Sequence, residues 1–509
     1  MTAFETISNQ PYLTRTKAQH PGGEKDGSPV LRLQGRAEKA AFLINGNQYF
    51  AEVSRTLRQA RRTVWIVGWD FNPDILMEPG KSDETLADLL HGLAAENPAL
   101  EIRILIWALG PIYSGKSLQV LRKKNFPNNP RIDLRFDLQG ALRGCHHQKL
   151  ICVDDAVAFI GGMDLTSRRW DTRHHRASDR LRRDPEGVSY DPLHDVQAMV
   201  MGEAARLIGD IARQRWETAT GEIHGPLPES MQFAWPDDLA VSLRQVPAGF
   251  ILTEPATTLR AGIGDGIASS LDIISRARRR LYIEAQYLAS FRVADAIAAR
   301  LQEASGPEVV VICTRSSHGL IEKLVMGGNR DRVIRRLKRA DRANRLRVYY
   351  PVVPGPKVPG PPMPGPATGS EVEVLIHSKL MIADDGLVRI GSSNLNNRSE
   401  GLDSECDLLF EAESPEHRRA IAELRSRLLS EYLGTSPASF AAAYAQSGSM
   451  IDAIDALNDG ARGLREFPVE LNGSISPVRG TAIFDPARPF LPLHRLGLGA
   501  IVRLFARTA

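Results

Sequence analysis

A long internal repeat is the feature that most constrains the fold of this chain. HQKLICVDDAVAFIGGMDL (147–165) and HSKLMIADDGLVRIGSSNL (377–395) align without a gap, 230 residues apart. Each copy predicts a strand, a tight turn at Asp-Asp, a second strand and a glycine-containing turn. Two copies of such a unit indicate that the chain is a duplicated α/β structure.

A second match, upstream of the first, supports the duplication. ARRTVWIVGWDF (60–71) resembles ARRRLYIEAQYL (277–288), and in both segments the end of a helix runs into an apolar strand. Strand-like runs alternate with helical stretches elsewhere, which predicts the α/β class with a largely buried sheet in each half. We expect a flexible N-terminal arm, two similar halves and a C-terminal appendage, with the boundaries 1–36, 37–246, 247–436 and 437–509.

Size and composition limit the class of protein. With 509 residues the chain is too long for one ordinary core, and its 43% hydrophobic and 24% charged residues are typical of a soluble globular protein. The formal charge of +4 gives no indication of a nucleic-acid partner, and four cysteines do not make a disulfide framework. The N-terminus lacks the apolar core of a secretory signal, and no run of eighteen apolar residues occurs. We therefore expect a cytoplasmic or peripheral membrane protein, with signal-independent export left open.

The paired His-x-Lys sequences indicate chemistry on a phosphate. Residues i and i+2 of a strand share a face, so His147 lies beside Lys149, and His377 lies beside Lys379. A lysine holds an anion while the neighbouring imidazole attacks or donates a proton. If the halves pack about a pseudo-twofold axis, two histidines face one phosphorus from opposite sides, as an in-line displacement needs, and no metal or other cofactor is required. A single His-x-Lys would carry little weight, whereas two copies in register favour this interpretation.

These segments resemble the paired HKD motifs of the phospholipase D superfamily. The likeness includes GMDLTSRRWD (162–171), PLHDVQAMVMG (192–202) and LYIEAQYL (281–288), and it spans roughly residues 43–412. The resemblance implies two similar α/β/α sandwich halves with mixed β-sheets. They would be related by a pseudo-twofold axis, with one active site at their interface.

The resemblance also implies roles for individual residues. His147 and His377 become the catalytic pair; family analogy favours His147 as the nucleophile, although the pseudo-symmetry leaves their order open. In this family an acidic residue from a later strand orients each histidine, and this assigns Asp195 to His147 and Glu405 to His377. The other expected positions are the phosphate-binding Lys149, Lys379, Asn394 and, by alignment only, Asp164, and the structural Asp154, Asp384, Gly161 and Gly391.

The expected function is that of a phospholipase D acting on phospholipid at a membrane surface. The enzyme would hydrolyse phosphatidylcholine or a similar glycerophospholipid to phosphatidic acid through a phosphohistidine, and an alcohol in place of water would give transphosphatidylation. The alternative is a cardiolipin-synthase-like phosphatidyltransferase, and a catalytically inactive lipid-binding protein or a nuclease ranks lower. Because one chain carries both motifs, a monomer is compatible with a complete site.

Several features keep two interpretations. The proline-rich segment 351–369 is either the border of a substrate entrance or a connector, and the basic run 168–184 is either a headgroup attractant or a solvated loop. The basic segment 330–347 is favoured as a solvated surface helix over a membrane contact. The apolar tail 496–507 is favoured as docked on the protein body over lying on a membrane. Three tryptophans are either core residues or the lining of a lipid pocket: Trp65, Trp69 and Trp170.

Overall fold

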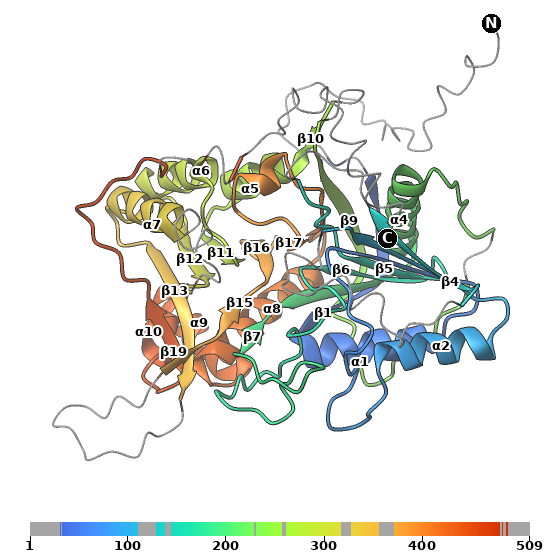
Figure 1. The fold of residues 1–509 in the computed structure, drawn as a ribbon. Helices are drawn as coiled ribbons and strands as arrows, with labels where there is room; N and C mark the ends of the chain where they lie inside the picture. Colours follow the sequence, from blue (N-terminus) through green and yellow to red (C-terminus); the bar gives the residue numbers. More distant parts are fainter. Residues whose placement is uncertain are drawn as a thin grey trace, which may run out of the picture.

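The described part of the chain forms one large mixed sheet with helices on both faces. The computed structural model describes residues 31, 33–109, 129–137, 144–228, 231–256, 261–316, 327–355, 371–478, 481 and 485–486. Figure 1 shows the first half, coloured blue to green, beside the second half, coloured yellow-green to red. The proline-rich segment beyond residue 355, the tail 496–507 and most of the N-terminal arm lie outside the described residues.

From the centre of the sheet outward, the equivalent strands of the two halves follow in the same order. In the first half it is β4 (Ile132–Asp137), β3 (Glu101–Trp107), β2 (Thr63–Gly68), β5 (Leu150–Val153), β6 (Val157–Gly161), β8 (Val196–Met201) and β1 (Leu33–Ile44). It continues through β9 (Leu243–Glu254), β18 (Glu405–Glu411), β17 (Leu387–Gly391), β16 (Lys379–Ala383), β11 (Arg280–Ala285), β12 (Glu308–Cys313) and β13 (Leu346–Pro354). The outer pairs β2–β3–β4 and β11–β12–β13 are parallel, and the other pairs of this order are antiparallel. The two halves are therefore similar α/β units related by a pseudo-twofold axis.

The pseudo-twofold axis passes between β1 and β9, which pair antiparallel from Leu33↔Phe250 to Ala40↔Leu243. β9 also pairs with β18, so the hydrogen-bonded sheet continues from one half into the other. The boundary placed at 246/247 from the sequence lies inside β9, and the boundary at 36/37 lies inside β1. Short strands complete the pairing: β7 (Leu193–His194), β10 (Ile263–Gly264), β14 (Glu371–Glu373), β15 (Leu375–Ile376) and β19 (Gly463–Glu466).

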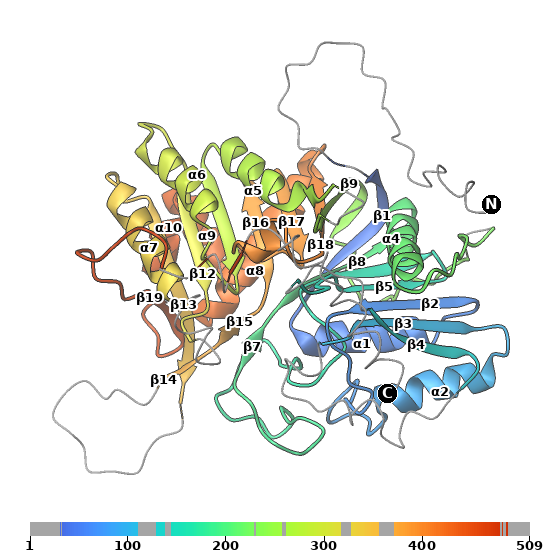
Figure 2. The same cartoon turned by 45° about the horizontal axis from the view of Figure 1, so that its top comes forward.

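Three apolar clusters explain why the central strands are buried on both faces. Along β5 the side chains alternate, with Leu150 and Cys152 in the cluster shared by the two halves and Ile151 and Val153 in the opposite one. α4 (Glu203–Thr220) and α8 (Pro415–Leu433) cover the shared cluster. α1 (Gly46–Leu57) and α2 (Leu86–Glu96) cover the other face of the first half, as Figure 2 shows. The second half carries α5 (Asp265–Arg276), α6 (Phe291–Gln302) and α7 (Gly328–Ala340) on its corresponding face.

Local sequence signals set the helix ends. Thr85 and Asp88 form a capping box at the start of α2, where each side chain satisfies a backbone N–H of the other. The Ser414 hydroxyl caps α8 at His417 N–H, and Gly434 ends that helix in the left-handed conformation.

The turn of each repeated hairpin is held by the first aspartate of its Asp-Asp pair. Asp154 and Asp384 have positive φ, and so do the residues that follow them, a pattern typical of a type I′ turn. The Asp154 carboxylate accepts three backbone N–H groups from 61–63, at 2.6–2.8 Å. The Asp384 carboxylate accepts the three corresponding groups from 278–280, at 2.5–2.9 Å. Both aspartates therefore fasten the hairpin to the turn that precedes β2 or β11.

The repeated glycines lie where neighbouring side chains leave no room for a Cβ. A Cβ on Gly161 would come 2.1 Å from Gln197 Oε1, and one on Gly391 would come 2.1 Å from Asp407 Oδ1. Each glycine thus permits the close approach between the end of the hairpin and the next strand.

The described part of the C-terminal appendage is fixed to the second half. α9 (Pro437–Ser447) and α10 (Met450–Leu457) precede β19, which pairs antiparallel with β13. The basic helix α7 is not simply solvated, because Arg332 donates to the carbonyl of Ser476 at 2.6 Å. Arg335 and Arg339 donate to further carbonyls of the same segment, at Glu470, Leu471, Gly473 and Ser474. Among the described helices, none is both long and apolar enough to cross a bilayer.

We predict that Asp154→Ala lowers the free energy of unfolding by about 3 kcal/mol, because three backbone N–H groups lose a buried, charged acceptor. Chemical denaturation of the variant and the parent chain measures this difference. The control is Asp133→Ala, which removes a partly exposed carboxylate paired with Arg135 and should change stability by less than about 1 kcal/mol. Equal losses in the two variants would contradict the fastening role of Asp154.

Candidate active site

The site lies where the two halves exchange backbone hydrogen bonds. β7 pairs in parallel with β15, and His146 forms an isolated parallel bridge with Ser404. In this arrangement His147 N–H donates to Ser404 O at 2.9 Å, and His377 N–H donates to His194 O at 2.8 Å. Each motif histidine, in the segment that leads into β5 or β16, is thus anchored to a segment of the opposite half.

The two carboxylates are exchanged between the halves. His147 Nδ1 lies 2.9 Å from Glu405 Oε2, and His377 Nδ1 lies 2.7 Å from Asp195 Oδ2. The assignment made from the sequence, Asp195 to His147 and Glu405 to His377, is therefore wrong. The reason is the backbone pairing: Asp195 follows the residue whose carbonyl binds His377 N–H, and Glu405 follows the residue whose carbonyl binds His147 N–H.

Burial dominates the electrostatics of these pairs. Burial raises the pKa of Glu405 to about 7, even though Ser392 and Ser399 donate hydroxyl hydrogen bonds to it at 2.6 and 2.7 Å. Burial also raises the pKa of Asp195, while the charge of Lys379 opposes that rise.

Both motif histidines are held in the neutral form. Burial and then the nearby lysines lower the pKa of His147 and of His377 well below the usual value. A neutral imidazole whose Nδ1–H donates to a carboxylate carries its lone pair on Nε2, the form needed for attack on phosphorus or for accepting a proton. The His147 side chain is 15% exposed and that of His377 is 7% exposed.

The two lysines fold back against their own motif histidines. Lys149 Nζ donates to His147 O at 2.8 Å, and Lys379 Nζ donates to His377 O at 2.5 Å. Lys379 also donates to Gln286 Oε1 at 2.9 Å, and burial lowers the pKa of Lys379. Burial disfavours a positive charge that has no negative partner. An anionic phosphate bound between the lysines would supply that partner.

The positions aligned as Asp164 and Asn394 are not equivalent in the structure. Asp164 Oδ2 lies 3.4 Å from Lys149 Nζ, and its Oδ1 accepts the backbone N–H of Trp69 at 2.8 Å. A buried carboxylate in this place suits the lysine and repels a phosphate, which departs from the phosphate-binding role expected for Asp164. The Oδ1 atom of Asn394, in contrast, is buried without a hydrogen-bond partner among the described residues.

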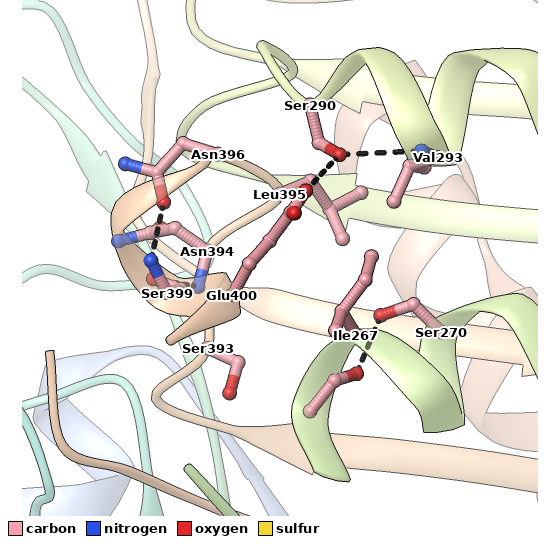
Figure 3. A pocket seen from close by; sticks show the side chains of 11 residues that line it. Ile267, Ser270, Ser290, Val293, Ser393, Asn394, Leu395, Asn396, Ser399 and Glu400 are labelled. Carbon is pink, nitrogen blue, oxygen red and sulfur yellow. Dashed lines mark hydrogen bonds between the residues drawn. The ribbon is translucent and has the colours of Figure 1, made fainter. Parts of the chain in front are cut away.

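Asn394 borders a small polar pocket that is drawn in Figure 3. Its backbone N–H donates to Ser399 Oγ at 3.2 Å, and Ser399 Oγ in turn donates to Glu405. Across the pocket Ser290 Oγ donates to Glu400 at 2.5 Å and accepts from Val293 N–H. The loop that carries Asn394 is therefore tied directly to the carboxylate that faces His147.

Sequence reasoning missed three residues of this site. Ser392 lies in the second repeat and Ser399 lies four residues beyond its end, and the contrast between Ser392 and its first-copy counterpart Gly162 was a visible signal. Arg169 is the third: after burial and Lys379, its charge is the next cause that lowers the pKa of His377. Its Nε is buried without a hydrogen-bond partner among the described residues, and its positive charge acts on His377.

The three tryptophans with two possible interpretations, core residue or lining of a lipid pocket, differ in burial. Trp65 is a core residue in edge contact with Trp216, and Trp170 is also buried. Trp69 is half-buried next to Asp164 and stacks on Trp107, with ring centroids 6.0 Å apart.

Comparisons with known proteins agree with this geometry. Residues 56–293 match the family model described as "Phospholipase D", and residues 271–428 match "Cardiolipin synthase, PLD-like domain". Phospholipase D2 of Bos taurus is 32% identical over 148 residues, which cover 28% of this chain and 15% of that protein. Phospholipase D1 of Saccharomyces cerevisiae is 26% identical over 499 residues, which cover 77% of this chain and 28% of that protein.

The chain thus spans less than a third of the length of these two relatives. Among solved structures, a phosphatidylserine synthase of Haemophilus influenzae has the same fold, with a TM-score of 0.51 at 14% identity over 78% of this chain and 87% of that chain. Together with the duplicated motifs at the junction of the halves, these matches show that the chain belongs to the phospholipase D superfamily.

Proposed function

We propose that this chain is a phospholipase D that hydrolyses a glycerophospholipid of the phosphatidylcholine type at a membrane surface. The observation that carries the proposal is the pair of histidines, each backed by a buried carboxylate from the opposite half and each beside a lysine. Such a site supplies a nucleophile, a proton donor and two cations to one phosphodiester.

In the first step His147 Nε2 attacks phosphorus and the bond from phosphorus to the headgroup oxygen breaks. His377 enters this step as the imidazolium, because the bound phosphodiester anion and the Asp195 carboxylate offset the burial that keeps it neutral in the free site. It gives its Nε2 proton to the departing oxygen, so that the headgroup leaves as an alcohol and His377 becomes neutral. Lys149 and Lys379 neutralise the negative charge on the equatorial oxygens, and the Asn394 side chain would donate an Nδ2–H to one of them. The greater exposure of His147 supports its choice as the attacking group.

In the second step His377 removes a proton from water, and the hydroxide displaces His147 from the phosphohistidine to release phosphatidic acid. An alcohol in place of water gives a phosphatidyl alcohol by the same route. Because one chain carries both motifs, a monomer can hold the whole site.

A second candidate is a phosphatidyltransferase that passes the phosphatidyl group to another lipid alcohol. The match of residues 271–428 to the cardiolipin synthase family model favours it. The phospholipase D relatives, which match as much as 77% of this chain, favour the hydrolase.

We expect the purified chain to convert phosphatidylcholine vesicles in ethanol-containing buffer to both phosphatidic acid and phosphatidylethanol. Excess chelator should leave turnover unchanged, because histidines and lysines supply the nucleophile and the charge. Lipid analysis by mass spectrometry measures both products, and His147→Asn should lower both by at least about a thousandfold. The absence of both products would contradict the proposal, and cardiolipin formed from phosphatidylglycerol would instead support the phosphatidyltransferase.

We predict that Glu405→Gln makes the fold more stable and lowers turnover. Because the pKa of Glu405 rises from 4.5 in the unfolded chain to about 7 in the fold, the folded chain binds the extra proton between those values. Stability is therefore lost as pH rises from about 4.5 to 7, by about 3 kcal/mol in total. Removing this carboxyl should raise the unfolding midpoint at pH 8 more than at pH 4.5, and turnover should fall by at least about a hundredfold.

Thermal unfolding at the two pH values checks the effect on stability. Glu423→Gln removes an exposed carboxylate of α8 and is the matched control, which should change the unfolding midpoint little. An equal gain at both pH values in Glu405→Gln would show that the fold does not resist ionisation of this carboxyl.

A further inference from the structure

A chain of buried charges lies beneath the His377 side of the site. Its six members alternate in sign and come from segments far apart in the sequence: Arg182, Asp171, His175, Glu431, His194 and Glu284. All six are buried. We call this set the buried ion chain. It includes residues of the RRWDTRHH and LYIEAQYL segments, to which the reaction described above gives no task.

The contacts along the buried ion chain are continuous. Arg182 Nη1 donates to Asp171 Oδ1 at 3.1 Å, and Asp171 Oδ2 lies 2.9 Å from His175 Nδ1. His175 Nε2 lies 3.0 Å from Glu431 Oε1, which also lies 3.1 Å from His194 Nδ1.

The last contacts reach the second motif. His194 Nε2 lies 3.2 Å from Glu284 Oε2, and Ser378 Oγ donates to that same oxygen at 2.6 Å. Ser378 stands between His377 and Lys379, so the chain ends inside the catalytic segment.

Both histidines of the chain lie between two carboxylates. Burial opposes a charge on His194, but Glu284 and Glu431 outweigh it and raise the pKa of His194 to about 10. The pKa of His175 is raised in the same way by Asp171 and Glu431. Two imidazolium ions and Arg182 then balance three carboxylates, so the buried chain is neutral as a whole.

A metal ion is the competing interpretation, because His175 Nε2, His194 Nδ1 and Glu431 Oε1 lie within 4.8 Å of one another. The 3.0 and 3.1 Å separations are those of direct hydrogen bonds. Asn45 Nδ2 donates to the same Glu431 oxygen at 2.8 Å, so that this oxygen faces three donors. The arrangement favours protons over a metal between these groups.

The buried ion chain includes or binds the residue next to each member of the His377–Asp195 pair. His194 precedes Asp195, and its carbonyl accepts His377 N–H. Ser378 follows His377 and is held by Glu284. The His194 cation also favours the ionised form of Asp195, the form that stabilises a protonated His377.

The two positions around His147 that correspond to His194 and Ser378 are uncharged, although ionisable side chains lie one residue away: His146, which contacts Asp137, and Asp403. Ser404 takes the place of His194, and Gln148 takes the place of Ser378, with its amide 3.3 Å from Glu405 O. The pseudo-twofold symmetry of the backbone is therefore broken at these positions, since a charged side chain directly precedes Asp195 but not Glu405.

We propose that the buried ion chain positions His377 and Asp195 for proton transfer and so makes His377, rather than His147, the acid and base of the pair. The proposal rests on the proposed function and deepens it. An acid–base histidine must keep its direction while it gains and loses a proton, and a rigid support on both sides provides this. His194, Glu284 and Ser378 are positioning residues, because they act through His377 and Asp195.

The test compares two leaving groups in single turnovers with enzyme in excess. Choline needs a proton as it leaves, whereas p-nitrophenolate leaves without one, so the p-nitrophenyl ester of phosphatidic acid bypasses the acid in the first step. His194→Gln should slow choline release about a hundredfold, and Ser378→Ala should slow it about tenfold. Both variants should change nitrophenolate release less than about threefold. Ser378→Ala leaves all six charges in place, which guards against a variant that fails to fold.

Equal slowing of both leaving groups would overturn the proposal, since a general loss of site structure affects both alike. Unchanged choline release in Ser378→Ala would also overturn it. If the parent chain itself released neither group, the proposed function would fail instead. Metal analysis of the parent chain completes the test, because one equivalent of tightly bound metal that is lost in His194→Gln would overturn the hydrogen-bonded assignment.

Discussion

Two backbone hydrogen bonds between the halves decide the arrangement of this site. His147 N–H binds Ser404 O, and His377 N–H binds His194 O. Since the next residue in each accepting segment is a carboxylate, the same two bonds set Glu405 beside His147 and Asp195 beside His377. Neither half holds a complete histidine–carboxylate pair alone. The catalytic arrangement therefore depends on the junction of the halves, across which the sheet continues through β1 and β9.

The site is built at an energetic cost that the surrounding fold has to offset. Two carboxylates, two lysines and two histidines are buried in one region, and burial opposes the charge on each kind of group. A phosphate brought between the lysines supplies the missing negative charge. The free site is thus less stable than its complex, as is typical of preorganised catalytic centres.

The hairpins and the His–Lys pairs could be predicted from the sequence because their signals are local. The Asp-Asp turns, the strand alternation and the repeated glycines each arise within about twenty residues of chain. The carboxylate partners depend instead on which half supplies the neighbouring strand, and an alignment of the two copies cannot show this. The assignment of Asp195 and Glu405 to the wrong histidines follows from that difference.

Other features were hidden for the same reason. The arginines of α7 have the spacing of a solvated helix, but the carbonyl groups that they bind lie more than a hundred residues away. The buried ion chain joins residues 171 to 431 and shows no periodicity in the sequence. The boundary predicted at 246/247 lies within β9, a strand that pairs with β1 on one side and with β18 on the other.

Nitrogen-15 NMR of histidine-labelled protein tests the exchanged pairing most directly. A ring Nδ1–H that donates to a buried carboxylate gives a strongly downfield proton signal, and its loss in His147→Asn assigns it to His147. The account predicts that this signal is lost in Glu405→Gln and kept in Asp195→Asn. A signal that is instead kept in Glu405→Gln and lost in Asp195→Asn would contradict the exchange of carboxylates between the halves.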